Sequence, residues 1–315
     1  MNDTREPFQT PKIMVVVGPT GAGKTGFAIR LARRFNGEIV GADSVQIYRF
    51  MDIGTAKPTL AEQRVIPHHM IDVVDPDQAF DAAAYAQMAA GFVHQIIARG
   101  RPVFVVGGTG LYIKALIHGL FPDAPSDLAV RRRLKQQMQM KGTAHLHGRL
   151  AQVDREAAMR IHPNDTYRIV RALEVFEVTG EPLTIFQRRH GFRNQRYDTL
   201  EFGLAWPRPL LYDRINHRVD AMLAEGFLEE VRQLLGRGYP RDLKSMQSLG
   251  YRHLAEVIMG ERDLASAVTT LKRDHRRYAK RQMTWFGARK SIHWLNPDQT
   301  ALAGELIHAF IRRPP

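Results

Sequence analysis

The residues Gly18-Pro19-Thr20-Gly21-Ala22-Gly23-Lys24-Thr25 match the G-x-x-x-x-G-K-[ST] pattern of a phosphate-binding loop. The apolar run Ile13-Met14-Val15-Val16-Val17 precedes them, and a helix-like stretch from Lys24 to Arg34 follows. This context predicts a strand, a loop and a helix, with backbone N–H groups of the loop wrapped around a phosphate. Lys24 adds a positive charge, and the Thr25 hydroxyl is a candidate Mg²⁺ ligand. The residues predicted to bind phosphate are Gly18, Thr20, Gly21, Ala22, Gly23, Lys24 and Thr25.

The acidic residue that usually accompanies such a loop is displaced. In motors and hydrolases, a second apolar strand ends in Asp or Glu, which orders Mg²⁺ through water. The best such strand here, residues 102–106, is followed by Gly107-Gly108-Thr109-Gly110 and has no acid at its end. Asp43 instead follows the strand-like residues 38–42. A carboxylate there is a candidate metal ligand or a general base directed at a substrate beside the phosphates.

Strand-like and helix-like segments alternate from Ile13 to about Gly119, which predicts a parallel sheet with helices on both faces. A Pro-rich junction at residues 121–126 then leads into helical patterns only, up to about Gly191. Strand character returns at residues 200–206 and is followed by further helices and a late strand. We therefore predict an α/β P-loop core from residues 1–120 and 200–315, interrupted by a helical insertion at 121–199. The later segments are expected at 210–224, 228–237, 264–285, 291–295 and 301–312.

Composition narrows the class of protein. The chain has 315 residues, of which 44% are hydrophobic, and it contains no cysteine, which excludes disulfides and thiolate chemistry. No apolar run approaches the roughly 20 residues of a membrane span, and the N-terminus has no secretory pattern, so we expect a cytoplasmic protein. The net charge of +13 favours a polyanionic partner, and nucleic acid in particular. Solvated helix faces are the alternative for each cluster of basic residues, at 131–133, 188–196 and 272–281.

Several motifs in order resemble one known family. Besides residues 18–25 and 107–112 they include the segments 43–48, 51–58, 162–165, 168–180, 214–220, 248–252 and 278–286. Together, from about residue 12 to 296, they resemble the bacterial type of the tRNA dimethylallyltransferase family. The resemblance implies transfer of a dimethylallyl group from dimethylallyl diphosphate to N6 of the adenosine at tRNA position 37, with release of diphosphate. It also implies Mg²⁺ as cofactor and tRNA as partner, and we expect a monomer.

The resemblance assigns roles to individual residues. Asp43 becomes the general base, residues 18–25 hold the diphosphate, Thr109 faces the same site, and Arg218 or, second, Arg214 contacts the leaving group. The helical insertion becomes a tRNA-binding domain. The residues expected to contact tRNA are Asp43, Ser44, Val45, Gln46, Thr109, Arg131, Tyr167, Arg168, Ile169, Val170, Arg171, Gln247, Ser248, Leu249, Gly250, Tyr251 and Arg252.

Other interpretations stay open at this point. Asp43 is also a candidate Mg²⁺ ligand or helix cap, and Arg214 and Arg218 are candidate surface ion-pair residues. An adenylate isopentenyltransferase would share the prenyl chemistry, and a small-molecule P-loop kinase would use the loop for ATP. A noncatalytic RNA-binding module is a further alternative. The paired histidines at 68–69 and at 145 and 147 are weak metal candidates, and the aromatic residues at 285, 286 and 294 are expected mainly in the core.

Overall fold

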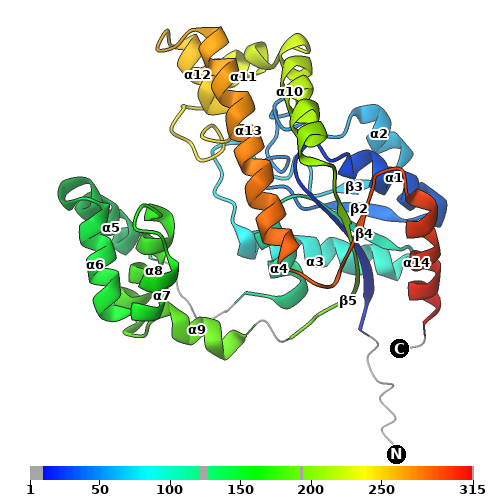
Figure 1. Cartoon of the computed structure of the whole chain (residues 1–315), viewed down its shortest axis with the longest axis horizontal. Helices are drawn as coiled ribbons and strands as arrows, with labels where there is room; N and C mark the ends of the chain where they lie inside the picture. Colours follow the sequence, from blue (N-terminus) through cyan, green and yellow to red (C-terminus); the bar gives the residue numbers. More distant parts are fainter. Residues whose placement is uncertain (1–9, 121–126, 192–193, 314–315) are drawn as a thin grey trace, which may run out of the picture. The chain divides into compact units, whose positions relative to one another are not determined.

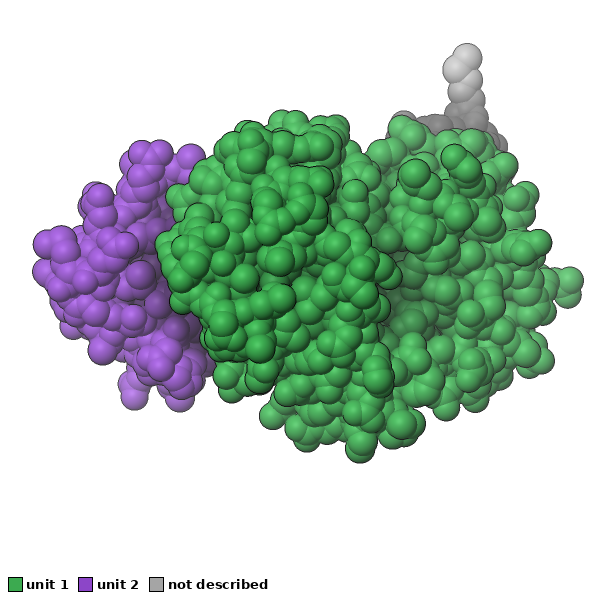
Figure 2. Space-filling model, turned by 90° about the horizontal axis from the view of Figure 1, so that it is seen from above, with its two compact units in different colours: residues 1–117, 196–315 green, residues 118–195 purple. Residues whose placement is uncertain are grey.

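The computed structural model describes residues 10–120, 127–191 and 194–313. The chain divides into two compact units, residues 1–117 with 196–315 and residues 118–195 (Figures 1 and 2). The predicted junction at 121–126 and Arg193 of the second basic cluster lie outside the described residues. No helix among the described residues is long and apolar enough to cross a membrane.

The first unit is built on a six-stranded sheet in which every pairing is parallel, as predicted. The strand order is β3-β2-β4-β1-β5-β6, so β1 lies near the centre between β4 and β5. Strand β5 begins two residues earlier than expected because Asp198 already pairs with Lys12 of β1. The strands are β1 (Lys12–Val17), β2 (Glu38–Gly41), β3 (His68–His69), β4 (Val103–Val106), β5 (Asp198–Leu204) and β6 (Ile292–Leu295).

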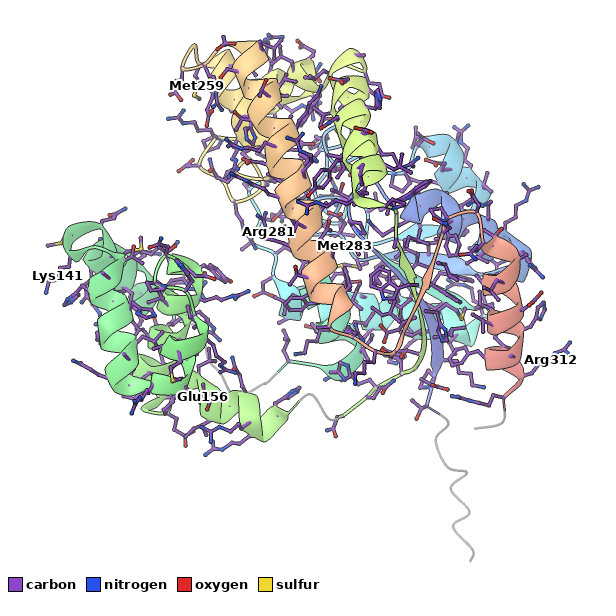
Figure 3. All side chains as sticks on the ribbon, viewed as in Figure 1. Lys141, Glu156, Met259, Arg281, Met283 and Arg312 are labelled. Atoms are coloured by element: carbon purple, nitrogen blue, oxygen red, sulfur yellow. The ribbon has the colours of Figure 1, made fainter. Side chains whose placement is uncertain are left out.

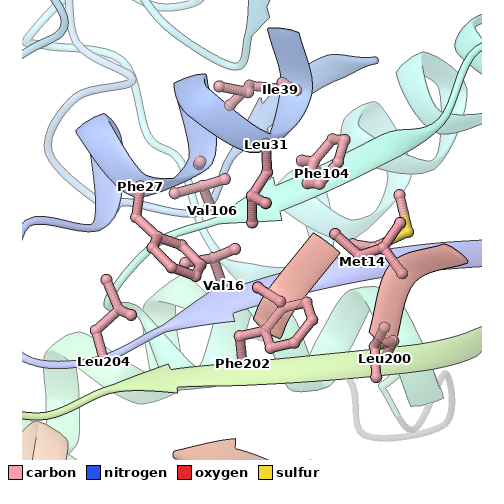
Figure 4. Close-up of a cluster of buried hydrophobic side chains, with 14 of the residues drawn as sticks. Met14, Val16, Phe27, Leu31, Ile39, Phe104, Val106, Leu200, Phe202 and Leu204 are labelled. Atoms are coloured by element: carbon pink, nitrogen blue, oxygen red, sulfur yellow. The ribbon is translucent and has the colours of Figure 1, made fainter. Parts of the chain in front are cut away.

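Helices cover both faces of this sheet. On one face, Phe27 and Leu31 of α1 and Ile307 of α14 pack against apolar residues of β1, β2, β4 and β5 (Figure 4). The β1 residues that alternate with these, such as Val15, are buried as well, and α3 packs on β2 and β4. The helices of this unit are α1 (Lys24–Phe35), α2 (Leu60–Val65), α3 (Ala82–Ala98), α4 (Gly110–His118), α10 (Arg208–Ala224), α11 (Phe227–Gly236), α12 (Tyr251–Ile258), α13 (Leu264–Gly287) and α14 (Thr300–Arg312).

Three elements of this unit have no counterpart among the predicted segments: α2, β3 and α12. Helix α2 buries none of its six residues, so it carries no apolar stripe, and its start is marked only by a capping box between Thr59 and Glu62. Strand β3 has two residues, and α12 has eight. Elements this short lack the repeated periodicity on which sequence patterns depend.

The second unit is entirely helical among its described residues. Its apolar core includes Leu146, Leu150 and Leu173, and the buried Asp154 caps α7 and also accepts hydrogen bonds from Thr184. Its helices are α5 (Leu128–Lys141), α6 (Thr143–Val153), α7 (Arg155–Arg160), α8 (Thr166–Thr179) and α9 (Leu183–His190).

Candidate active site

A pocket of about 970 Å³ opens at the carboxyl ends of β1, β2 and β4, and all of its lining residues belong to the first unit. Residues directly after each of these strands contribute to its wall, as is usual for ligand sites in parallel α/β sheets. The rest of the wall comes from the loop at 52–60, from the segment 247–252, and from α10 and α13.

The phosphate loop adopts its conformation through contacts within the loop itself. Gly21 and Gly23 have φ angles of 78° and 89°, in the left-handed region that favours glycine. The Ala22 N–H donates to the Pro19 carbonyl at 3.2 Å, and Lys24 Nζ donates to the same oxygen at 2.8 Å. Thr20, Gly21, Gly23, Lys24 and Thr25 line the pocket, whereas the Ala22 side chain is buried. The loop thus presents the start of α1 to the pocket, where an anion is favoured.

Lys24 is a cation in a poorly solvated position. Burial, together with the nearby Arg218 guanidinium, lowers the pKa of Lys24 to about 8, although the Asp43 carboxylate opposes both effects. Lys24 and Arg218 repel each other, and Asp43 offsets only part of this repulsion. The pair therefore favours the binding of an anionic ligand, which relieves the repulsion.

Asp43 lines the pocket, and Thr109 is bonded to Ser44, the next residue of the chain, although Thr109 itself is not among the lining residues. Asp43 Oδ1 accepts the Val45 N–H at 2.9 Å and the Gln46 N–H at 3.4 Å, so this oxygen caps the turn after β2. Asp43 Oδ2 accepts no hydrogen bond from the residues that the structure describes, which leaves one carboxylate oxygen available to a ligand. Thr109 Oγ1 accepts the Ser44 N–H at 3.0 Å.

Tyr278 joins this pair from α13. Its hydroxyl lies near the Thr109 side chain, and burial, with the Asp43 charge in second place, raises the pKa of Tyr278 to about 12. Tyr278 therefore stays protonated at neutral pH and places a neutral hydroxyl beside the carboxylate. The sequence motif at 278–286 includes this residue, but its spacing alone does not link it to Asp43.

The two arginines of α10 have different positions. Arg218 lines the pocket, its Nη2 lies 3.4 Å from the Thr55 carbonyl, and its buried Nε has no hydrogen-bond partner in the structure. Arg214 is exposed, donates from Nε to the Gly21 carbonyl at 3.0 Å, and stacks on Trp206 at 4.5 Å. Arg218 is therefore the arginine that can reach a ligand, while Arg214 supports the outer side of the phosphate loop.

Glu230 of α11 holds the loop that closes one side of the pocket. Its carboxylate accepts the N–H groups of Asp52, Ile53 and Gly54 at 2.7–3.1 Å and the Tyr251 hydroxyl at 2.7 Å. Glu230 is not predicted as a site residue, because its backbone partners at 52–54 lie 176 to 178 positions earlier and no local pattern connects them.

Several predicted tRNA contacts also lie on the pocket wall. They are Ser44, Val45, Gln46, Gln247, Ser248, Leu249 and Arg252. The Gln46 amide is already engaged, because its Nε2 donates to the carbonyls of Thr55 and Ala56. The Tyr251 side chain is fully buried, and Gly250 precedes α12 with a φ of 92°. These last two residues shape the wall and offer no side-chain surface to a ligand.

The predicted contacts of the second unit fall into two groups. Tyr167 is 74% exposed and Arg168 is also exposed, so both are accessible to a large partner. The side chains of Ile169 and Val170 lie in the apolar core of this unit. Their side chains therefore offer no surface to RNA in this conformation, and a contact of these two residues with tRNA stays a prediction.

Arg131 and Arg171 surround a buried acid. The Glu174 carboxylate is fully buried and accepts hydrogen bonds from Arg131 and Arg171 at 2.9 and 3.0 Å. Burial alone would raise the pKa of Glu174, but hydrogen bonds from Arg171 and Arg131 outweigh it and hold the pKa below its ordinary value. These two arginines neutralise an internal charge, which is a structural role that the sequence does not reveal.

The weaker candidates occupy other environments. His69 pairs with the buried Glu38 at 2.7 Å, and His147 bonds to two backbone carbonyls. No group of three or more His, Asp or Glu side chains suited to a metal occurs within the part of the chain that the structure describes. Phe286 is buried as expected, whereas Trp285 is 40% exposed.

Comparison with known proteins gives consistent results. The family described as IPP transferase matches residues 46–290. A tRNA dimethylallyltransferase from Desulfosudis oleivorans is 54% identical over 92% of this chain and 92% of the relative. One from Desulfatibacillum aliphaticivorans is 50% identical over 95% of this chain and 98% of the relative.

Solved structures agree with these sequence matches. The tRNA isopentenylpyrophosphate transferase of Bacillus halodurans aligns with a TM-score of 0.70 at 40% identity, over 95% of this chain and 96% of that one. A structure of a eukaryotic dimethylallyltransferase acting on tRNA aligns with a TM-score of 0.81 at 27% identity, over 97% of this chain and 80% of that one.

Proposed function

This chain belongs to the tRNA dimethylallyltransferase family, and from that premise we propose that it moves a dimethylallyl group from dimethylallyl diphosphate to N6 of adenosine 37 in tRNA. One observation supports the proposal most directly. Three groups line the same pocket: Lys24 of the phosphate loop, the carboxylate of Asp43, and Arg218, whose buried Nε has no hydrogen-bond partner in the structure.

The reaction needs a base and an anion site, and the pocket has both. The N6 lone pair attacks the allylic carbon, a C–N bond forms, and the C–O bond to diphosphate breaks with its electron pair leaving on oxygen. One N6 proton passes to Asp43, whose free Oδ2 is suited to receive it. Lys24, Arg218 and the loop N–H groups stabilise the charge that develops on the departing diphosphate. No water has to be activated, which agrees with the absence of an acid after Val106.

A divalent metal fits this donor set, and Mg²⁺ is the ion we propose. The Thr25 hydroxyl lines the pocket beside Lys24 and would hold the metal together with diphosphate oxygens and water. When bound, the metal would supply additional charge neutralisation for the diphosphate. We assign Asp43 the role of base and not of metal ligand. One of its oxygens already caps the turn after β2, which leaves only the other oxygen for the substrate.

The RNA partner fits the charge of the molecule. A net charge of +13 and accessible residues such as Tyr167 and Arg168 on the second unit suit binding to a polyanion with unpaired bases. We include monomeric action in the proposal, as expected from the sequence analysis. The adenylate isopentenyltransferase and P-loop kinase alternatives are not favoured by the family relationship.

The test is a set of parallel incubations of the purified protein. Labelled dimethylallyl diphosphate is supplied with Mg²⁺ and either an unmodified tRNA transcript with A37, the same transcript with G37, or AMP. A fourth reaction contains ATP and no prenyl donor. We expect label only in the A37 transcript, on N6 by nuclease digestion and mass spectrometry. Label in AMP would support the adenylate enzyme, steady phosphate release from ATP would support a kinase or ATPase, and no turnover at all would contradict the proposal.

A further inference from the structure

Gln282 of α13 connects the phosphate loop to the loop after β4. Its Oε1 accepts the Thr20 N–H at 2.8 Å, and its Nε2 donates to the Gly108 carbonyl at 3.0 Å. The side chain is 6% exposed and lines the pocket. A backbone donor on one side and a backbone acceptor on the other fix the orientation of the amide, so only a glutamine-like group satisfies both.

The bridge is tightly enclosed. A Cβ atom added to Gly108 would lie 2.2 Å from Gln282 Nε2, so residue 108 must lack a side chain for the amide to reach its partner. Thr20 lies inside the phosphate loop, and its N–H is one of the backbone donors that such loops direct at a ligand. Here that donor is held by the glutamine, which limits the positions that residues 19–22 can adopt.

The same face of α13 reaches the acidic side of the pocket. Tyr278, one helical turn before Gln282, lies near Thr109, and Thr109 accepts the Ser44 N–H next to Asp43. Two residues four positions apart on one rigid helix therefore contact both the anion-binding loop and the loop that supports the carboxylate. Arg281, between them in sequence, is also part of the pocket wall (Figure 3).

We propose that Gln282 is a positioning residue for the diphosphate. It holds the phosphate loop at a set distance from the loop after β4, and so places the leaving group relative to Asp43. This inference rests on the proposed prenyl transfer. Because binding of inorganic pyrophosphate reports on the loop without any chemistry, the two proposals can fail separately.

Two variants remove the bridge in different ways. Gln282→Met keeps the length of the side chain and removes both hydrogen bonds. Gly108→Ala leaves α13 unchanged and displaces the tip of Gln282, the flexible end of a side chain; the φ angle of Gly108 is compatible with alanine. Thr269→Ala is the matched control, because Thr269 is an exposed residue of α13 that bonds only to the Ala265 carbonyl of its own helix.

The measurements are the Kd of inorganic pyrophosphate with Mg²⁺, the Kd of tRNA, the kcat and KM for dimethylallyl diphosphate, and the melting temperature. We expect both bridge variants to bind pyrophosphate about tenfold more weakly, because each loses two buried hydrogen bonds that hold the loop. The KM for dimethylallyl diphosphate should rise by a similar factor. The Kd of tRNA should stay within about twofold of wild type, and Thr269→Ala should match wild type throughout.

Other outcomes would overturn the inference. A lower melting temperature with unchanged pyrophosphate affinity in both variants would make the bridge a purely structural contact. An equal loss of tRNA and pyrophosphate affinity would point to general disorder of the pocket. If Gln282→Met does not fold, Gly108→Ala decides the question alone. If wild type transfers no prenyl group, the function fails, while the pyrophosphate measurements still test the bridge.

Discussion

The depressed pKa of Lys24 makes a quantitative prediction for the binding of pyrophosphate. The charged ammonium binds the anion, and the pKa of this group in the free protein is about 8, so the charged form is present below that pH and is lost above it. The charged fraction falls from about nine-tenths at pH 7 to about one-tenth at pH 9, so the Lys24 contribution alone weakens binding about tenfold over this range. A lysine with its ordinary pKa of 10.5 would give no such change.

The assay is calorimetric titration with pyrophosphate and Mg²⁺ at pH 7, 8 and 9, on wild type and on Lys24→Arg. Pyrophosphate also titrates in this range, and arginine stays charged throughout, so the ratio of the two dissociation constants isolates Lys24. We expect the ratio of wild-type Kd to variant Kd to rise about tenfold between pH 7 and 9. The prediction concerns this pH trend only, since arginine need not bind as tightly as lysine at any single pH.

Two groups near Lys24, His275 and Tyr278, have pKa values outside this window. Burial, helped by Arg218, lowers the pKa of His275 to about 4, and Tyr278 titrates near 12. A ratio that stays constant from pH 7 to 9 would show that Lys24 keeps its charge in the free protein. The account of a desolvated loop cation beside Arg218 would then be wrong.

Three further predictions concern other parts of the molecule. Asp43→Asn should lower kcat about 10²–10⁴-fold, while the Kd of tRNA stays within a few-fold of the wild-type value. A variant that retains more than roughly a tenth of wild-type turnover would contradict the general-base role. Arg168→Ala should change the free energy of unfolding by less than about 0.5 kcal/mol and reduce the log–log salt slope of tRNA binding by about 0.7–0.9. Arg171→Ala should destabilise the second unit by about 1–3 kcal/mol, because Glu174 loses a partner. Urea unfolding and salt titrations of tRNA binding distinguish the two variants, and identical effects would refute the distinction. Glu230→Gln should cost about 2–4 kcal/mol in urea unfolding, because an amide NH₂ would face donors that now bond to a carboxylate, and an unchanged midpoint would show that the loop does not depend on this acid.

The phosphate loop could be predicted from sequence because its structure is local. Its glycines supply the left-handed φ angles, and the bonds of Ala22 and Lys24 to the Pro19 carbonyl span at most five positions. Strands β1 and β4 could be predicted for a similar reason, since residues 13–17 and 103–106 are continuous apolar runs followed by glycine. Asp43 was identified because it directly follows such a strand.

Local patterns did not distinguish residues of one type that have different partners. Arg214 and Arg218 lie four positions apart on α10, yet one braces the loop through the Gly21 carbonyl and the other faces the pocket with an unpartnered Nε. Arg168 and Arg171 are both basic residues of α8, but only the second neutralises the buried Glu174. Burial of Glu174 decides the role of Arg171, and burial is a property of the packed unit.

The sequence by itself determined the loop that binds phosphate, the parallel α/β core, the acid beside the loop and the basic character of the chain, since each depends on a short contiguous pattern or on composition. Only the tertiary structure decided which side chains hold these parts in place. Gln282 meets Thr20 from 262 positions away, and Glu230 meets Asp52 from 178 positions away. Such contacts form because tertiary packing brings helices α11 and α13 against loops that follow β1, β2 and β4, and no periodicity within either helix specifies which distant backbone group will face a buried amide or carboxylate.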